Sequence, residues 1–156
     1  MRPQLSLATQ TALISGGSRG IGAATVRLFS TAGAQVAFSY QRAENEAEKL
    51  ARNCGENCKA LQAELNSPAA AGALVRAAVA RLGRLDVLVA NHGIWAPEDV
   101  PIEQMTAEQW RRTMAVNLDS ILGLVKHAVA QMKEVACVSW AIRQATVSAC
   151  VPKGGT

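Results

Sequence analysis

The sequence predicts an α/β fold, a doubly wound parallel sheet with helices on both faces. Short apolar runs that suit buried strands alternate with longer stretches of helical period, and this alternation favours parallel strands joined by helices. Hydrophobic residues make up 49% of the 156 residues and aromatic residues only 4%. Small aliphatic side chains therefore supply the core, as in helices packed closely on a sheet. The length predicts one domain over residues 1–156. We expect an incomplete sheet of about four to five strands.

The first half of the chain contains three predicted strands with helices between them. The strands cover 11–15 (TALIS), 35–40 (QVAFSY) and 59–65 (KALQAEL), which are apolar or alternating runs. The first helix follows a glycine-rich stretch and covers 20–30, and a second, charged helix covers 42–53.

The second half begins with a helix whose two ends are marked in the sequence. Ser67 is a capping residue, Pro68 suits the first helical position and Gly83 follows the last turn, which predicts a helix over 68–82. The later elements are a strand at 85–91 (LDVLVAN) and helices near 106–115 and 118–133. After Lys133 no clear period remains, so we expect residues 134–156 to form a divergent tail.

Charge and hydropathy argue against several classes of protein. The net charge is +4, yet the basic residues are spread out and the longest run is Arg111-Arg112. Without a basic stripe interleaved with aromatic residues, we expect no nucleic-acid binding. No apolar run approaches the roughly 18 residues of a membrane span. The N-terminal MRPQLSLATQ lacks the apolar core of a signal peptide. We therefore expect a soluble cytoplasmic protein that does not bind membranes.

The cysteines are expected to be free thiols in that compartment. They are Cys54, Cys58, Cys137 and Cys150. The stretch CGENC has no histidine or second cysteine pair nearby, whereas a structural zinc needs four ligands. We expect no metal site.

The stretch ISGGSRGIG (14–22) joins the first strand to the first helix. Backbone amides at a helix N-terminus are unpaired donors in a positive potential, so such a site favours a phosphate. Gly16 would make the turn, while Gly20 and Gly22 would let a pyrophosphate and the helix approach closely. The spacing G-x-x-x-G-x-G is also compatible with an ordinary strand-to-helix turn. The flanking strand and helix favour a Rossmann-like dinucleotide site.

The end of the second strand bears on the choice of coenzyme. A carboxylate there would bind the ribose hydroxyls of NAD, whereas this chain has SYQR at 39–42 and no acid. We expect Tyr40 and Arg42 of this stretch to be cofactor-binding residues. Arg19 and Arg42 could both face a 2′-phosphate, and charge-assisted hydrogen bonds from arginine are strong. NADP is therefore favoured over NAD. The alternative is that Arg42 only begins a solvated helix.

Three motifs, SGGSRGIG, LVANHG (88–93) and MAVNLDS (114–120), resemble those of short-chain dehydrogenases/reductases in order and spacing. The resemblance covers residues 8–133. Within the family, the sequence resembles NADP-dependent 3-oxoacyl-[acyl-carrier-protein] reductase-like members in particular. It implies hydride transfer between NADPH and a carbonyl or alcohol substrate. It also implies that the cofactor is held by Ser15, Gly16, Ser18, Arg19, Gly20, Ile21, Gly22, Glu64, Leu65, Asn91 and Gly93.

The same resemblance gives expectations for single residues. Asn117 matches the asparagine whose backbone holds a water in the family's proton relay. His92 replaces the alanine of the family's N-N-A-G, and we interpret it as a variant of the cofactor pocket, not as the acid. We expect Asp86 to cap or pair at the start of its strand. His127 is expected at a surface or interface.

The family's catalytic Tyr-x-x-x-Lys is absent from this sequence. Its single tyrosine, Tyr40, lies at the end of the second strand instead. Ser139, after the apolar run VACV, could stand in for the catalytic serine at the end of a fifth strand, and Ser148 is the other candidate. Neither is followed by a tyrosine. We therefore expect 134–156 not to continue the family pattern, because of a shifted reading frame, an alternative ending or a degraded gene.

Two functions remain open from the sequence. The first is an NADP-dependent oxidoreductase of this family, present as its truncated cofactor-binding portion and inactive alone. The alternative is a catalytically inactive nucleotide-binding or oligomerisation protein, which would pair with full-length members of the family through the helix near 118–133. In either case a homo-oligomer is possible by the resemblance.

Overall fold

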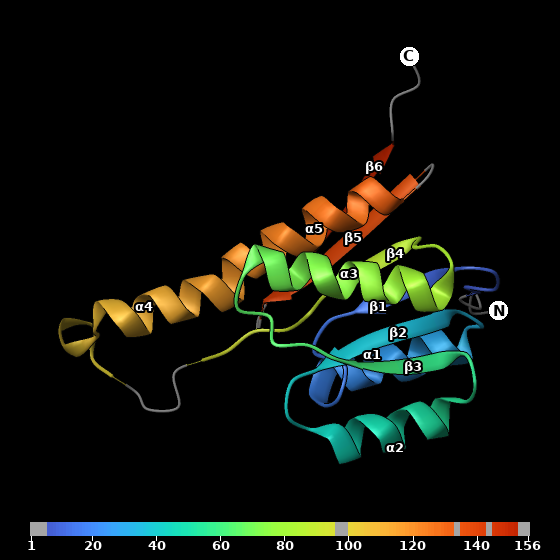
Figure 1. The fold of residues 1–156 in the computed structure, drawn as a ribbon, viewed down its shortest axis with the longest axis horizontal. Helices are drawn as coiled ribbons and strands as arrows, with labels where there is room; N and C mark the ends of the chain where they lie inside the picture. The colour runs from blue at the N-terminus through green and yellow to red at the C-terminus, as the bar shows by residue number, and fades with distance from the viewer. Residues whose placement is uncertain (1–5, 96–99, 133–134, 143–144, 153–156) are drawn as a thin grey trace.

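A six-stranded sheet in the order β3-β2-β1-β4-β5-β6 runs through the molecule (Figure 1). The computed structural model describes residues 6–95, 100–132, 135–142 and 145–152, and of the last two ranges it describes the backbone. The strands are β1 (Thr11–Ile14), β2 (Gln35–Tyr40), β3 (Cys58–Gln62), β4 (Val87–Ala90), β5 (Val135–Ile142) and β6 (Ala145–Pro152). The helices are α1 (Gly20–Thr31), α2 (Glu44–Cys54), α3 (Pro68–Leu82), η1 (Ile102–Gln104), α4 (Ala107–Met114), η2 (Ala115–Asp119) and α5 (Ser120–Gln131).

Strands β1 to β5 are parallel, and β6 runs antiparallel to β5. The predicted α/β fold with a parallel sheet is confirmed. Residues 135–142, which the sequence pattern placed in a divergent tail, extend the parallel sheet as β5. Residues 145–152 then return along β5, so the sheet has one strand more than the upper expectation. Both segments are almost continuously apolar. Without an alternation of apolar and polar residues, the sequence does not indicate where each strand begins and ends.

Helices cover the two faces of the sheet in pairs (Figure 1). Helices α1 and α2 lie on one face, where Val26 and Leu50 pack with Ile14 and Phe38. Helices α3 and α5 lie on the other. The core of that second face includes Leu13, Leu74, Val75, Ala78, Leu88, Leu124 and Ala128. Each face therefore has its own apolar core, as a doubly wound sheet requires.

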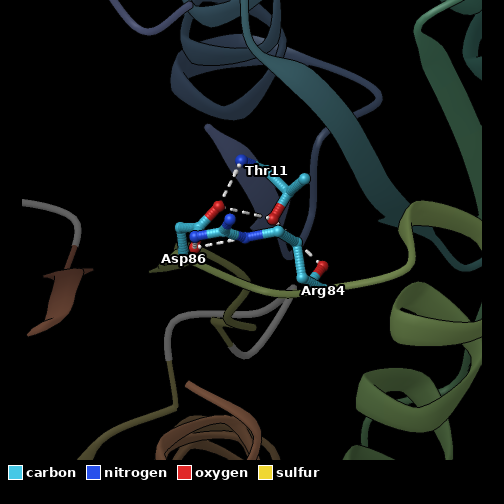
Figure 2. Close-up of polar contacts among 3 residues, drawn as sticks. All are labelled: Thr11, Arg84 and Asp86. Carbon is cyan, nitrogen blue, oxygen red and sulfur yellow. Dashed lines mark hydrogen bonds and ion pairs between the residues drawn. The ribbon is translucent and has the colours of Figure 1, made fainter. Parts of the chain in front are cut away.

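A polar cluster fastens the amino ends of β1 and β4 (Figure 2). Asp86 Oδ2 accepts hydrogen bonds from the backbone N–H and the hydroxyl of Thr11, both at 2.9 Å. The guanidinium of Arg84 donates to Asp86 Oδ1, with Nε at 2.9 Å. Burial alone would raise the pKa of Asp86, but the hydrogen bonds from Arg84 and Thr11 outweigh it and lower the pKa. The prediction that Asp86 pairs at the start of its strand is confirmed.

Helix α3 begins and ends where the sequence predicts. Ser67 Oγ accepts a hydrogen bond from the Ala70 N–H at 3.2 Å, Pro68 occupies the first turn, and Gly83 ends the helix at φ +80°. His127 packs against α3, because a Cβ at Gly72 would lie 2.6 Å from its Nε2. His127, expected at a surface or interface, is instead half-buried between α5 and α3 of the same chain.

The two helices expected near 106–115 and 118–133 form one continuous helical rod. Helix α4 passes into α5 through η2, a π-helical turn. In Figure 1 α4 extends beyond the sheet, and none of its residues is buried. None of the described helices combines the length and the hydropathy that a membrane span requires.

Candidate functional site

Three segments meet at the carboxyl edge of the sheet. Ile14 lies opposite Phe38 of β2 and Val89 of β4, so these three strands end together. The loop 15–19 leaves β1 there and leads into α1, and residues 91–94 leave β4 beside it. Hydrogen bonds of His92 and Asn117 connect these two segments to η2 and the start of α5. This edge is where open α/β sheets bind ligands.

The glycine loop is shaped by two close approaches. Gly16 has φ +66°, which suits glycine, and a Cβ there would lie 3.0 Å from the Cα of His92. At Gly22 a Cβ would lie 2.2 Å from the carbonyl oxygen of Gly16 and 2.6 Å from Asn91 Nδ2. Glycine at these positions lets the first turn of α1 fold back against the loop.

Asn91 fastens the end of β4 to the loop. Its Nδ2 donates hydrogen bonds to the carbonyl oxygens of Ser15 at 3.3 Å and Gly16 at 3.1 Å. Its backbone N–H donates to Ser15 Oγ at 3.0 Å. The structure therefore gives Asn91, expected at the cofactor, a role in holding the loop that would bind it.

His92 bridges two serines from different elements. Its Nδ1 lies 2.7 Å from Ser15 Oγ, and its Nε2 lies 2.7 Å from Ser120 Oγ at the start of α5. Ser15 and Ser120 are fully buried. Burial lowers the pKa of His92 to about 4, against an ordinary value of 6.5, so the ring is neutral at neutral pH. The interpretation of His92 as other than the acid agrees with this pKa.

The N-terminus of α1 has free donors. Its N-cap, Arg19, makes no side-chain cap hydrogen bond, and no acidic residue lies in the first turn. By contrast, α3 is capped by Ser67 and α4 by Thr106. Gly20 and Ile21 are exposed. The first turn of α1 therefore offers unpaired N–H groups and the positive end of a helix dipole to solvent.

A shallow cavity of about 380 Å³ lies at the carboxyl ends of β2 and β3. Its lining residues are Gln41, Arg42, Gln62, Ala63 and Glu64. Arg42, expected at a 2′-phosphate, and Glu64, expected at the cofactor, thus share one pocket. The side chain of Leu65 is instead part of the core beneath α3.

Tyr40 does not line that pocket. Its ring is buried, and its hydroxyl donates a long hydrogen bond of 3.5 Å to Glu44 Oε1. Burial and the neighbouring Glu44 raise the pKa of Tyr40. Its hydroxyl is therefore protonated near neutral pH.

Asn117 lies in the π-helical turn and holds the segment after β4. Its Oδ1 accepts a hydrogen bond from the Ile94 N–H at 2.8 Å, and its Nδ2 donates to the Ile94 carbonyl at 2.9 Å. π-Helical turns inside α-helices occur frequently at functional sites. The two bonds place Asn117 at the same edge as the glycine loop.

The predicted catalytic serines lie on the last two strands. The backbone of Ser139 on β5 pairs with Val89, and Ser148 on β6 pairs with Ser139. Their side chains lie outside what the structure describes. Among the described residues, no group of three metal-ligating side chains occurs.

Two contributors were missed by the sequence analysis. Ser120 ends the motif MAVNLDS, and its position directly ahead of the apolar run ILGLV was its only sequence signal. The structure buries it, so its hydroxyl needs an internal hydrogen-bond partner. Ile94 contributes only its backbone N–H and carbonyl, which bond to the side chain of Asn117. Any residue type could make these bonds, so the sequence does not indicate them.

A parallel sheet, a glycine loop and an open helix N-terminus meet at this edge, the arrangement at which one class of α/β fold binds dinucleotides. The model of the short chain dehydrogenase family matches residues 10–138. The chain belongs to that family. The match continues past Lys133 into β5, beyond the residues that carried the resemblance.

Individual relatives agree with this assignment. The short-chain dehydrogenase/reductase FrzI of Cladobotryum sp is 35% identical over 132 residues, which are 83% of this chain and 50% of that protein. A blue fluorescent protein from a metagenomic library, solved with NADPH, is similar with a TM-score of 0.77 and 36% identity over 83% of this chain and 53% of that one. The 3-ketoacyl-(acyl-carrier-protein) reductase of Brucella melitensis, solved with NADH, gives a TM-score of 0.74 and 28% identity over 81% and 51%. The chain spans about half the length of the relatives it matches.

Proposed function

We propose that this chain binds a nicotinamide dinucleotide, with its pyrophosphate over the N-terminus of α1. The observation that carries the proposal is the uncapped first turn of α1, next to a loop that Asn91 holds in place. When bound, such a coenzyme supplies or accepts a hydride. Structures similar to this chain that were solved with NADPH and NADH support the proposal.

Within this proposal the residues divide into two groups. Ser18, Arg19, Ile21, Gly93 and the glycines of the loop contact the coenzyme, and Glu64 lies beside its adenine. Ser15, which is fully buried, supports the loop from beneath through its hydroxyl. The two groups differ in what substitution does: loss of a contact weakens binding alone, whereas loss of a support also lowers stability.

NADP(H) is preferred over NAD(H) in this proposal. Arg42 lines the cavity at the end of β2, and Arg19 is exposed at the start of α1. Both carry a positive charge with which a 2′-phosphate forms strong hydrogen bonds. The carboxylate of Glu64 also lines this cavity and weakens the preference through like-charge repulsion.

The coenzyme preference is tested by titration of NADPH and NADH into the wild-type chain, Arg42→Ala and Arg27→Ala. Arg27 is exposed on α1, and its replacement is the matched control. Arg42→Ala is expected to weaken NADPH binding at least about ten-fold, the effect of losing a charged hydrogen bond, and to leave NADH binding unchanged. Equal binding of the two coenzymes by the wild-type chain would overturn the preference.

We propose that this site is part of the machinery with which proteins of this family transfer a hydride to a carbonyl substrate. The 156 residues contain no Tyr-x-x-x-Lys, so they lack the usual tyrosine that passes the proton. We therefore infer binding without turnover by this chain. The test is to mix the purified chain with NADPH and a carbonyl substrate and to measure NADPH by its absorbance. Consumption of NADPH by the chain alone would contradict the inference.

A second function, pairing through the helical rod, is favoured by one observation. Leu118 and Leu122 lie one turn apart and are 54% and 67% exposed. An apolar pair of this kind suits a helix–helix contact with another copy of the chain. Light scattering after size exclusion tests this: Leu122→Glu is expected to reduce the mass to that of a monomer, whereas Leu28→Glu, equally apolar and 54% exposed on α1, is not. A monomeric wild-type chain would overturn it.

A further inference from the structure

The bridge from Ser15 through His92 to Ser120 fixes where the imidazole proton lies. Ser15 Oγ accepts the backbone N–H groups of Asn91 at 3.0 Å and His92 at 3.3 Å. With both acceptor positions used, its own hydrogen is left for the third partner, His92 Nδ1, at 2.7 Å. Nδ1 therefore accepts and carries no proton.

The other end of the bridge leads to the same assignment. Ser120 Oγ lies 2.7 Å from the carbonyl oxygen of Val116, to which it can only donate. Its oxygen is then free to accept from His92 Nε2 at 2.7 Å. The reverse tautomer would leave two oxygens, Ser120 Oγ and the Val116 carbonyl, in contact without a hydrogen between them. All three bonds are satisfied only with the proton on Nε2.

We propose that His92 is a positioning residue for the dinucleotide site, whose neutral Nε2–H ring ties the glycine loop to the start of α5. The proposal rests on the proposed binding of a dinucleotide. The bridge connects Ser15, next to the turn at Gly16, with Ser120, three residues after Asn117. Both segments that form the edge are thereby held at a fixed separation by one side chain.

Packing around the ring agrees with a positioning role. The Cβ of His92 lies 3.1 Å from the point that a Cβ on Gly16 would occupy, so the loop rests directly on this residue. Protonation of Nδ1 would place a third donor against Ser15 Oγ and leave the Ser15 hydrogen without an acceptor. Neutral His92 is therefore the form that supports the loop.

The tautomer is tested on the wild-type chain by two-bond ¹⁵N–¹H correlation spectroscopy of its imidazoles. The sequence has two histidines, and the signals of His127 are those that disappear in His127→Gln. His92 is expected as the Nε2–H tautomer at neutral pH. An Nδ1–H tautomer, or a mixture of the two, would overturn the bridge, whether or not the chain binds a nucleotide.

The positioning role is tested with Ser120→Ala, which removes the far end of the bridge and touches no predicted coenzyme contact. Thr113→Ala is the matched control: Thr113 makes the same kind of hydrogen bond to a carbonyl four residues earlier, that of Gln109 at 2.9 Å, without a histidine. Ser120→Ala is expected to weaken NADPH binding about three- to ten-fold, the range for one lost neutral hydrogen bond. Thr113→Ala is expected to bind as wild type does.

The possible outcomes separate this proposal from the proposed function. If the wild-type chain binds NADPH and Ser120→Ala binds it equally well, only the positioning role of His92 fails. If the wild-type chain is folded and binds neither NADPH nor NADH, the proposed function fails and the positioning role with it. The rescue variant is His92→Gln, whose amide nitrogen can reach Ser120, and it is expected to bind more tightly than His92→Ala.

Discussion

The side-chain amide of Asn117 forms a closed pair of hydrogen bonds with the backbone of Ile94, at 2.8 Å and 2.9 Å. A residue of the helical rod thereby holds the chain as it leaves β4. The carboxyl edge is thus assembled from segments that contribute backbone groups as well as side chains.

Asn117→Asp is expected to lower the free energy of unfolding by about 1–3 kcal/mol, because the new carboxylate oxygen faces the Ile94 carbonyl and neither can donate. Urea unfolding followed by circular dichroism measures the change. Asn45→Asp, in the exposed first turn of α2, is the control and is not expected to destabilise. Equal stability of Asn117→Asp and wild type would show that the pair of bonds contributes nothing.

Gly22→Ala is expected to disrupt the glycine loop, since the new methyl group would lie 2.2 Å from the Gly16 carbonyl oxygen. Overpacking of this kind costs about 1–3 kcal/mol. Thermal unfolding measures it, with Ala24→Ser, exposed on the same helix, as the control. Unchanged stability of Gly22→Ala would mean that the loop does not fold against α1 as described.

Stability is expected to fall as the pH decreases from about 6.5 to about 4, because of His92. Its pKa is about 4 in the folded chain against an ordinary 6.5, so in this range the unfolded chain binds more protons than the folded chain. The loss amounts to about 3 kcal/mol over the whole range. Urea unfolding at several pH values measures it, and His92→Asn, which cannot titrate, is expected to show a flatter profile. Identical profiles would place the acid sensitivity elsewhere.

Asp86→Asn is expected to destabilise the amino edge of the sheet by about 1–3 kcal/mol, since the carboxylate accepts bonds from both Thr11 and Arg84. The pKa of Asp86 is lowered, so this contribution is present above pH 3.8 and is lost as the pH falls through the folded pKa. Glu48→Gln, which breaks the exposed pair with Arg52, is the control and is expected to change stability by less than about 1 kcal/mol. A comparable effect of both substitutions would contradict the account.

The sequence allowed prediction of the elements that carry a local signal. The cap at Ser67 and the stop at Gly83 set both ends of α3, and the continuous apolar strand at 85–91 identified β4. The glycine loop could be predicted because glycines at this spacing indicate where backbone segments approach one another closely. Asn91 was placed at this edge by its match to the second asparagine of the family's N-N-A-G.

Features that depend on tertiary contacts were not accessible in this way. His92 lies 77 positions from Ser15 and 28 positions from Ser120 in the sequence. No local sequence pattern can therefore predict the bridge that it forms between them. The π-helical turn that joins α4 to α5 contains no residue type from which it could be predicted. Strands β5 and β6 were missed as a pair because their apolar composition lacks a period.

The most direct test of the central claim is calorimetric titration of NADPH and NADH into the folded 156-residue chain, with Gly22→Ala as the comparison. The account predicts saturable binding of one coenzyme per chain, tighter for NADPH, and weaker binding by Gly22→Ala. A folded wild-type chain that binds neither coenzyme at millimolar concentration would contradict the assignment of a dinucleotide site to this edge.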